Sequence, residues 1–140
     1  MTILATATAT SSAAPAVFFA RWADTATWPE WNTDTEWVRL DGPFTQGATG
    51  TLKPKGGPKV RFVVERLTDT EFVDVSRLFG ATLTFAHVVA VADGRTTVRV
   101  TVSIEGPLRR LWIAILGGGV TKSVQPDLDA LVEVAERVRA

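Results

Sequence analysis

The sequence predicts an α+β fold in which seven antiparallel strands form a sheet that curves around one long C-terminal helix. In the last third of the chain, apolar residues recur at three- and four-residue spacing, which places them in one stripe along an α-helix. These residues are Leu108, Leu111, Trp112, Ile115, Leu116, Val120, Val124, Leu128, Leu131, Ala135 and Val138. In the segments before them, apolar and polar residues alternate as in half-buried strands. Because a lone amphipathic helix must bury its stripe, we expect the helix to pack on the sheet.

The chain is expected to begin with a strand and a short helix. Residues Thr2 to Thr10 alternate in the manner of a strand, with one apolar face and one threonine face. The apolar face holds Ile3, Ala5, Ala7 and Ala9, and the other holds Thr6, Thr8 and Thr10. Ser12 can cap the helix that follows, and Pro15 still falls in its first turn, where its missing N–H is not needed. Phe18 and Trp22 are four residues apart, so both can face the core.

A second short helix is expected over Trp28 and Trp31. Asp24 or Thr25 can cap its start, and Asn32 can end it. The two short helices together hold three of the five tryptophans of the chain.

Six further strands and the long helix complete the single domain predicted over residues 1–140. The strands are expected at Glu36–Leu40, Thr49–Lys53, Val60–Glu65, Thr70–Arg77, Thr82–Ala92 and Arg95–Glu105. The helix is expected over residues 107–139, with Pro107 in its first turn. Gly117 to Gly119 and Pro126 predict a kink within it.

The turn between the last two strands predicts their register. Asp93-Gly94 is a strong signal for a two-residue hairpin loop, which pairs Ala92 with Arg95. Counting back along both strands places His87 opposite Val100 and Phe85 opposite Val102.

The register of the preceding hairpin is open to two interpretations. A three-residue loop, Leu78 to Gly80, pairs Arg77 with Ala81 and places Glu71 opposite His87. The alternative is a slip by one residue, which turns Phe72, Asp74 and Ser76 toward the core instead. We favour the first register because it places valine beside valine on the inner face.

With the first register, a polar row crosses the inner face of the sheet. A Thr68-Asp69 loop pairs Arg66 with Glu71, and Glu71 then lies beside His87. His87 is the only histidine of the chain and the only side chain whose ordinary pKa lies near neutrality. The alternative is that the row is a purely structural polar crossing, or that Arg66 and Glu71 lie at its solvent-exposed end.

Composition excludes several classes of function. Fifteen basic residues balance fifteen acidic ones, so no net charge recruits nucleic acid or an anionic membrane. The chain has no cysteine, which excludes disulfides and thiol catalysis. One histidine and no clustered carboxylates argue against a metal site, and no motif indicates a cofactor. Without a signal peptide or membrane span in the sequence, we expect a cytoplasmic protein, monomeric by default with a dimer possible.

The order of elements and three short motifs resemble the helix-grip fold of the START/Bet v 1-like superfamily, also called SRPBCC or polyketide cyclase/dehydrase. The motifs are Phe19-x-x-Trp22-x-Asp24 leading to Trp28-Pro29-Glu30-Trp31-Asn32, then Ala81-x-Leu83-x-Phe85-x-His87, and Gly106-Pro107-Leu108. The resemblance covers nearly the whole chain. It implies an elongated apolar cavity between the sheet and the long helix.

The leading functional hypothesis is binding of a hydrophobic small molecule, such as a lipid, an isoprenoid or an aromatic polyketide-like compound, in that cavity. Apolar lining is abundant and acid/base groups are scarce, which suits binding without chemistry. The residues expected to line the cavity are Trp31, Phe44, Phe62, Arg66, Phe85, His87, Val100, Trp112 and Leu116.

Two alternatives belong to other classes. The first is a polyketide cyclase, aromatase or dehydratase in which His87 is the general acid/base, Glu71 orients it and Arg66 keeps Glu71 ionised. Trp31 and Phe85 would then shape the substrate. The second alternative is a protein-interaction module, which a cavity below roughly 300 Å³ would favour.

Overall fold

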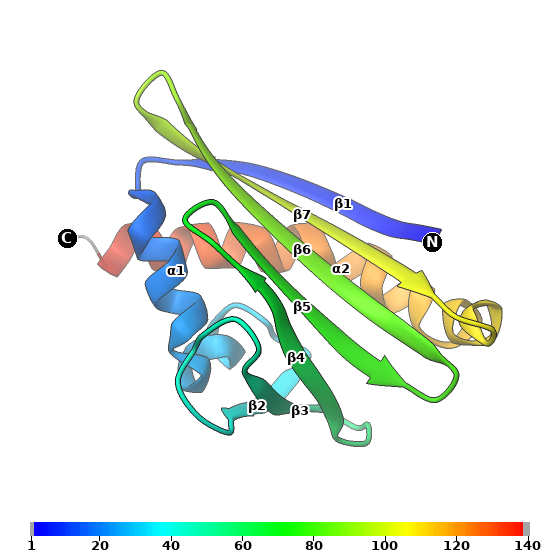
Figure 1. The fold of residues 1–140 in the computed structure, drawn as a ribbon. Helices are drawn as coiled ribbons and strands as arrows, with labels where there is room; N and C mark the ends of the chain where they lie inside the picture. Colours follow the sequence, from blue (N-terminus) through cyan, green and yellow to red (C-terminus); the bar gives the residue numbers. More distant parts are fainter. Residues whose placement is uncertain (1, 139–140) are drawn as a thin grey trace.

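The predicted architecture is confirmed by a computed structural model, which describes residues 2–138. Its elements are β1 (Thr2–Ser11), α1 (Pro15–Ala23), the 3-10 helix η1 (Thr25–Glu30), β2 (Thr35–Leu40), β3 (Thr49–Pro54), β4 (Val60–Leu67), β5 (Glu71–Leu78), β6 (Ala81–Ala92), β7 (Arg95–Glu105) and α2 (Arg109–Val138). The order of elements is the predicted one (Figure 1). The predicted helix end at Arg139 lies outside the described residues.

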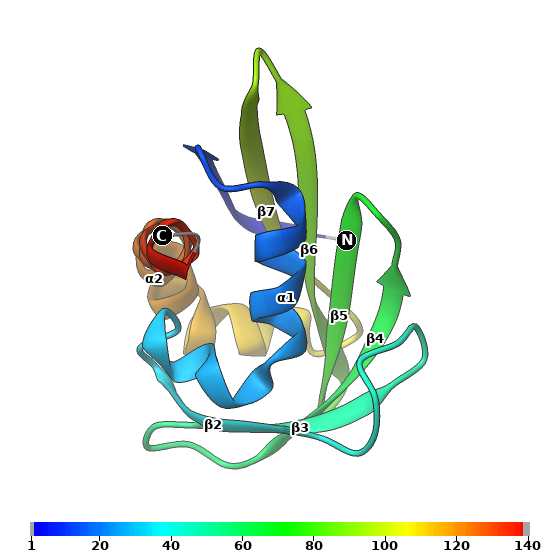
Figure 2. The same ribbon diagram turned by 90° about the vertical axis from the view of Figure 1, so that its left-hand side faces the viewer.

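The seven strands form one antiparallel sheet in the order β1-β7-β6-β5-β4-β3-β2. Figure 2 shows this sheet as a curved wall with α1, η1 and α2 on its concave side. The first strand pairs with the last, and β1 deviates from the predicted alternation because a register shift between Ile3 and Ala5 leaves Ile3 exposed. The concave face holds the core, and the site lies there.

The β6–β7 hairpin has the predicted register. Ala92 pairs with Arg95, Phe85 with Val102 and His87 with Val100. Both turn residues, Asp93 and Gly94, have positive φ, of 54° and 74°. This backbone is the one that a tight two-residue hairpin turn requires.

The favoured register of the β5–β6 hairpin is wrong, and the one-residue slip is correct. Leu78 pairs with Ala81, so the turn contains only Phe79 and Gly80, and Phe72 lies opposite His87. Phe72 is fully buried on the inner face. Burying a phenylalanine ring removes more apolar surface from water than burying a valine, which decides the register.

The predicted Thr68-Asp69 loop is also wrong. β4 contains a bulge between Val64 and Arg66, after which Arg66 pairs with Val73 and Val64 with Asp74. The Thr68 hydroxyl accepts hydrogen bonds from the backbone N–H groups of Thr70 and Glu71. These bonds form a longer turn than the one predicted.

The two short helices place their aromatic residues as predicted, but their starts differ. α1 begins at Pro15 after Ala14, without a side-chain cap, so Ser12 is not the capping residue. Asp24 precedes η1 and likewise makes no side-chain cap bond. Phe18 and Trp22 are buried, and Trp28 donates its indole N–H to the carbonyl of Trp22 at 3.0 Å.

The buried hydrophobic residues of α2 lie in its C-terminal half, whereas Trp112 and Ile113 in its first turns are only partly buried against the core. The helix begins at Arg109, two residues after Pro107, and it bends between its first turns, drawn in yellow, and the remainder (Figures 1 and 2). The Thr121 hydroxyl donates to the carbonyl of Gly117 at 2.7 Å, a bond that favours helix bending beside the glycines. Leu111 and Ile115, predicted in the buried stripe, are consequently exposed. Within residues 2–138, no helix is long and apolar enough to cross a bilayer.

Candidate functional site

The concave side of the sheet contains three adjoining hollows between the strands, η1 and α2. The largest has a volume of about 340 Å³, and two smaller ones of about 80 Å³ each lie beside His87. Asn32 and Phe85 line all three hollows, which therefore adjoin one another. We call the three hollows together the cavity.

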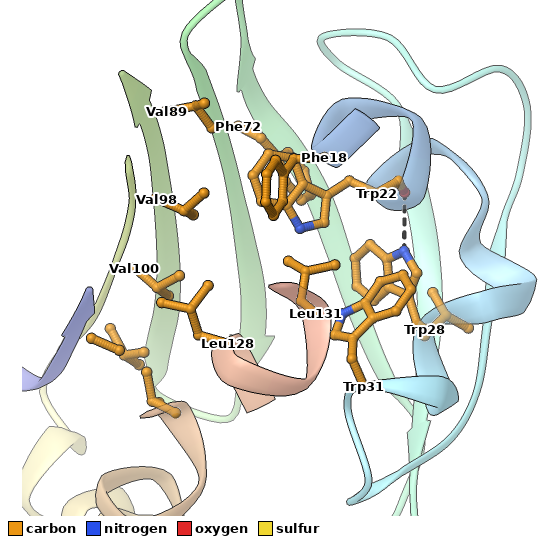
Figure 3. Packing of buried hydrophobic residues seen from close by; sticks show 14 of the residues in the cluster. Phe18, Trp22, Trp28, Trp31, Phe72, Val89, Val98, Val100, Leu128 and Leu131 are labelled. Carbon is orange, nitrogen blue, oxygen red and sulfur yellow. Dashed lines mark hydrogen bonds between the residues drawn. The ribbon is translucent and has the colours of Figure 1, made fainter. Parts of the chain in front are cut away.

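Five of the predicted lining residues lie on the wall of the cavity. Trp31 and His87 line both small hollows, Val100 lines one of them, and Leu116 lines the large one together with Phe85. Leu128 and Leu131 of α2 point toward Val100 and Trp31 (Figure 3). The structure therefore brings these side chains together from β6, β7, α2 and the residue that follows η1.

Four predicted lining residues lie elsewhere. Phe62 is buried and stacks on Trp28 with ring centroids 6.2 Å apart, so it belongs to the core. Phe44 packs on the edge of Phe72 and lines an outer groove along α1. Arg66 is exposed, and Trp112 lies at the start of α2, where its indole N–H donates to the carbonyl of Phe79 at 2.7 Å.

The imidazole of His87 is held in one orientation. Its ring stacks on Phe72 with centroids 4.8 Å apart, and its Nδ1 lies 2.8 Å from the carbonyl oxygen of Phe72. Because a carbonyl oxygen only accepts, Nδ1 carries the proton and Nε2 keeps the lone pair. Burial lowers the pKa of His87 to about 4, and the bond to Phe72 opposes this shift. The ring is therefore neutral near pH 7.

Asp74 is the acidic residue beside His87. It lies on β5 with its carboxyl group buried and its Oδ1 4.0 Å from Nδ1 of His87, too far for a hydrogen bond. Burial raises the pKa of Asp74 to about 7. Near pH 7, His87 is neutral and can act as a base, and Asp74 is partly protonated and can act as an acid. Both residues line the same small hollow, and they do not form an ion pair.

The predicted partnership of Glu71 with His87 is wrong. Glu71 pairs with Val88, one position away from His87, and the alternation of the strand turns it to the opposite face. Its carboxylate lies 3.4 Å from Nε of Arg66, and both side chains are solvent-accessible. The polar row therefore does not cross the cavity, and Arg66 and Glu71 form a surface pair.

The sequence contained one signal for Asp74 and none for Asp127. Asp74 alternates with Phe72 and Ser76, which are the inward residues of the slipped register. Asp127 is half-buried on α2 and lines two of the hollows. Burial and the carboxylate of Asp34 raise the pKa of Asp127 to about 6. Its position in a helix between Pro126 and Leu128 gives no indication that it faces a cavity.

The polar groups of the cavity do not resemble a metal centre. Among residues 2–138, no three histidine, aspartate or glutamate side chains are grouped as ligands of a metal ion. The groups that face the cavity instead suit hydrogen bonding and proton transfer to an organic molecule.

Many solved structures are similar to this fold. A START superfamily protein from Mycobacterium smegmatis has a TM-score of 0.69 at 12% identity, covering 95% of this chain and 97% of its own. The Zhui aromatase/cyclase from Streptomyces sp. R1128 has a TM-score of 0.70 at 14% identity, covering 96% and 94%. A truncated norcoclaurine synthase from Thalictrum flavum has a TM-score of 0.70 at 8% identity, covering 92% and 90%. At these identities the likeness shows the fold alone.

The sequence itself is decisive about the family. No curated protein matches it. Residues 2–136, however, match the family described as polyketide cyclase / dehydrase and lipid transport. The match spans every strand and nearly the whole of α2, in agreement with the resemblance predicted from the motifs. The chain belongs to the polyketide cyclase/dehydrase and lipid transport family.

Proposed function

We propose that the protein binds a compact hydrophobic small molecule in the cavity between the sheet and α2. The observation that supports this most is the hollow of about 340 Å³, whose wall includes Leu52, Leu83, Phe85 and Leu116. This volume lies at the lower end of the roughly 300–1,000 Å³ of ligand pockets. It suits a single-chain lipid, an isoprenoid or an aromatic polyketide-like compound better than a lipid with two long chains.

Polar groups on the wall of the cavity indicate what such a ligand carries. His87 offers the lone pair of Nε2, and the protonated form of Asp74 offers an O–H donor. Asn32 adds an amide at the point where the three hollows meet. A ligand with one hydroxyl or carbonyl group on an otherwise apolar body matches this arrangement.

Native mass spectrometry of gently purified protein tests the proposal, because a ligand that co-purifies identifies its class. Leu116→Trp should fill the large hollow and abolish ligand uptake. Leu111→Trp is the matched control on the same helix, because Leu111 is exposed and does not line the cavity. If no ligand co-purifies and a panel of lipids and aromatic compounds leaves the Tm unchanged, the proposal is wrong.

A second candidate, a cyclase or dehydratase, is supported by the opposite pKa shifts of Asp74 and His87. In a β-hydroxyketone substrate, Nε2 of His87 would remove a proton from the carbon beside the carbonyl group. Protonated Asp74 would donate its proton to the β-hydroxyl, so that a C=C bond forms, the C–O bond breaks and water leaves. A proton returned from His87 to Asp74 restores both groups.

Kinetics on a β-hydroxyketone substrate separate this candidate from simple binding. Asp74→Asn and His87→Gln should each lower turnover by about 10²-fold or more while KM changes little. Glu71→Gln should leave turnover unchanged, because Glu71 lies on the other face of the sheet. Full turnover in both cavity variants would exclude this mechanism.

The protein-interaction alternative loses support from the size of the cavity. A cavity below roughly 300 Å³ would favour a protein-interaction module. The large hollow exceeds this volume, at about 340 Å³.

A further inference from the structure

An apolar surface lies at the end of the molecule where β5 turns into β6 and α2 begins. Phe79 is 83% exposed, and Leu111 and Ile115 are 54% and 59% exposed. Leu111 and Ile115 are four residues apart and therefore lie on one side of the helix. We call these three residues, with Arg77, Arg109 and Arg110, the hairpin–helix surface.

Backbone contacts fix the two segments of this surface to each other. The indole N–H of Trp112 donates to the carbonyl of Phe79 at 2.7 Å, and the N–H of Leu108 donates to the carbonyl of Gly80 at 2.9 Å. A Cβ at Gly80 would lie 2.6 Å from side-chain atoms of Leu108, so the turn packs directly on the start of the helix. The exposure of Phe79 is therefore a fixed feature of the fold.

Most of the charged residues around the apolar residues are basic, although Glu105, which is exposed and pairs with Thr82 beside the hairpin turn, is acidic. Residues 75–92 contain Arg77 and no acidic residue, and residues 106–126 contain Arg109, Arg110 and Lys122 and no acidic residue. The whole chain, by contrast, has equal numbers of acidic and basic residues. Arginines beside an exposed phenylalanine, leucine and isoleucine are typical of surfaces that bind anionic lipid headgroups and place apolar side chains below them.

The surface adjoins the cavity. Ile115 is both exposed and part of the wall of the large hollow, and Leu78, the residue before Phe79, lines the same hollow. A partner seated on the surface would thus contact the rim of the cavity.

We propose that the hairpin–helix surface docks the protein peripherally on an anionic lipid bilayer. A second copy of the chain fits the surface less well, because a two-fold contact would place Arg109 and Arg110 of one copy near the same arginines of the other. An anionic bilayer neutralises these charges and accepts Phe79, Leu111 and Ile115 in its interfacial layer. The proposal does not depend on which molecule occupies the cavity.

Sedimentation of the full chain with lipid vesicles tests this proposal. The protein should bind vesicles of phosphatidylcholine mixed with phosphatidylglycerol, bind vesicles of phosphatidylcholine alone at least tenfold less, and dissociate at high salt. Phe79→Ser combined with Leu111→Ser, and separately Arg110→Glu, should each weaken binding to the anionic vesicles by tenfold or more. All three residues are exposed, so these variants should fold, which an unchanged Tm verifies.

Two control variants change the same kinds of side chain at another place. Val91 is 61% exposed in the β6–β7 hairpin, at the other end of β6, and Arg99 is exposed on β7. Val91→Ser and Arg99→Glu should bind vesicles like the unaltered protein. The proposal is overturned if the unaltered protein does not bind anionic vesicles, if the controls lose binding equally, or if light scattering shows a dimer that Phe79→Ser dissociates.

Discussion

The pair of buried titratable groups predicts opposite effects of pH on stability in two single variants. Burial raises the pKa of Asp74 from 3.8 to about 7 and lowers that of His87 from 6.5 to about 4. Between pH 4 and 6.5, Asp74 is ionised in the unfolded chain but protonated in the folded one. His87 is protonated in the unfolded chain but neutral in the folded one.

The magnitudes follow from proton linkage. A one-proton difference between the folded and unfolded states changes the free energy of unfolding by about 1.4 kcal/mol per pH unit. For Asp74 the folded state binds the extra proton, so its contribution to stability is greatest below about pH 4 and is lost as pH rises to about 7. For His87 the unfolded state binds the extra proton, so stability is lost as pH falls from 6.5 to about 4. In the unaltered protein the two slopes nearly cancel.

Each variant removes the pH dependence of stability that comes from one group and leaves the pH dependence that comes from the other. As pH rises from 4 to 6.5, His87→Gln should lose about 1.4 kcal/mol of stability per pH unit, because only Asp74 contributes. Over the same range Asp74→Asn should gain about as much, because only His87 contributes. The difference between the two slopes is the quantity to measure, because background groups such as Asp127 contribute equally to both variants.

Urea unfolding followed by tryptophan fluorescence gives these slopes. Trp22, Trp28 and Trp31 are buried in the folded state, so their emission should change when the protein unfolds. Ser76→Ala, which changes a buried neighbour of Asp74 without adding or removing a titrating group, controls for altered packing. Equal slopes in both variants would refute the assignment of displaced pKa values to this pair.

Three further substitutions test individual parts of the fold. Gly80→Ala should lower the free energy of unfolding by about 1–3 kcal/mol in urea titrations, because the residue has a φ of 71° and its Cβ would meet Leu108; an unchanged midpoint would contradict the close turn. Phe72→Ala should cost about 3–5 kcal/mol in the same titration, whereas Phe79→Ala should cost little, because only the first ring is buried; a small cost for Phe72→Ala would favour the rejected register. Glu71→Gln should change stability by no more than about 1 kcal/mol, as for a surface ion pair, and should not alter ligand affinity in calorimetry; a large loss of affinity would place Glu71 in the site.

Much of the fold could be predicted because its determinants are local. The alternation of β6 and β7 and the Asp93-Gly94 turn are sequence-local features, and they determine the confirmed pairing of His87 with Val100. The periodicity of the last helix predicts the helix itself and a buried stripe along its whole length, of which the C-terminal half is buried. The monomeric state and the cytoplasmic location stay predictions.

Which residues face the cavity depends on contacts between distant parts of the chain, and local sequence patterns do not predict these contacts. On β5 the two candidate faces are both partly apolar, and the choice between them depends on aromatic residues from α1, η1 and the loop before β3. Phe72 contacts Trp22, Trp28 and Phe44, and these contacts bring Asp74 inward. The exposure of Leu111 likewise follows from the bend of α2, which periodicity alone does not reveal.

Nuclear magnetic resonance of the single histidine tests most directly whether a small molecule binds beside Asp74 and His87. Nitrogen spectra of the imidazole report the tautomer, and 2-naphthol is a suitable probe because it has one hydroxyl group on an apolar body. Near pH 7 the free protein should show a neutral ring protonated at Nδ1. Saturation with 2-naphthol should shift the Nε2 resonance in the unaltered protein and in Leu111→Trp, but not in Leu116→Trp. An imidazole that is protonated at Nε2, or that does not respond while 2-naphthol binds, would contradict this account of the site.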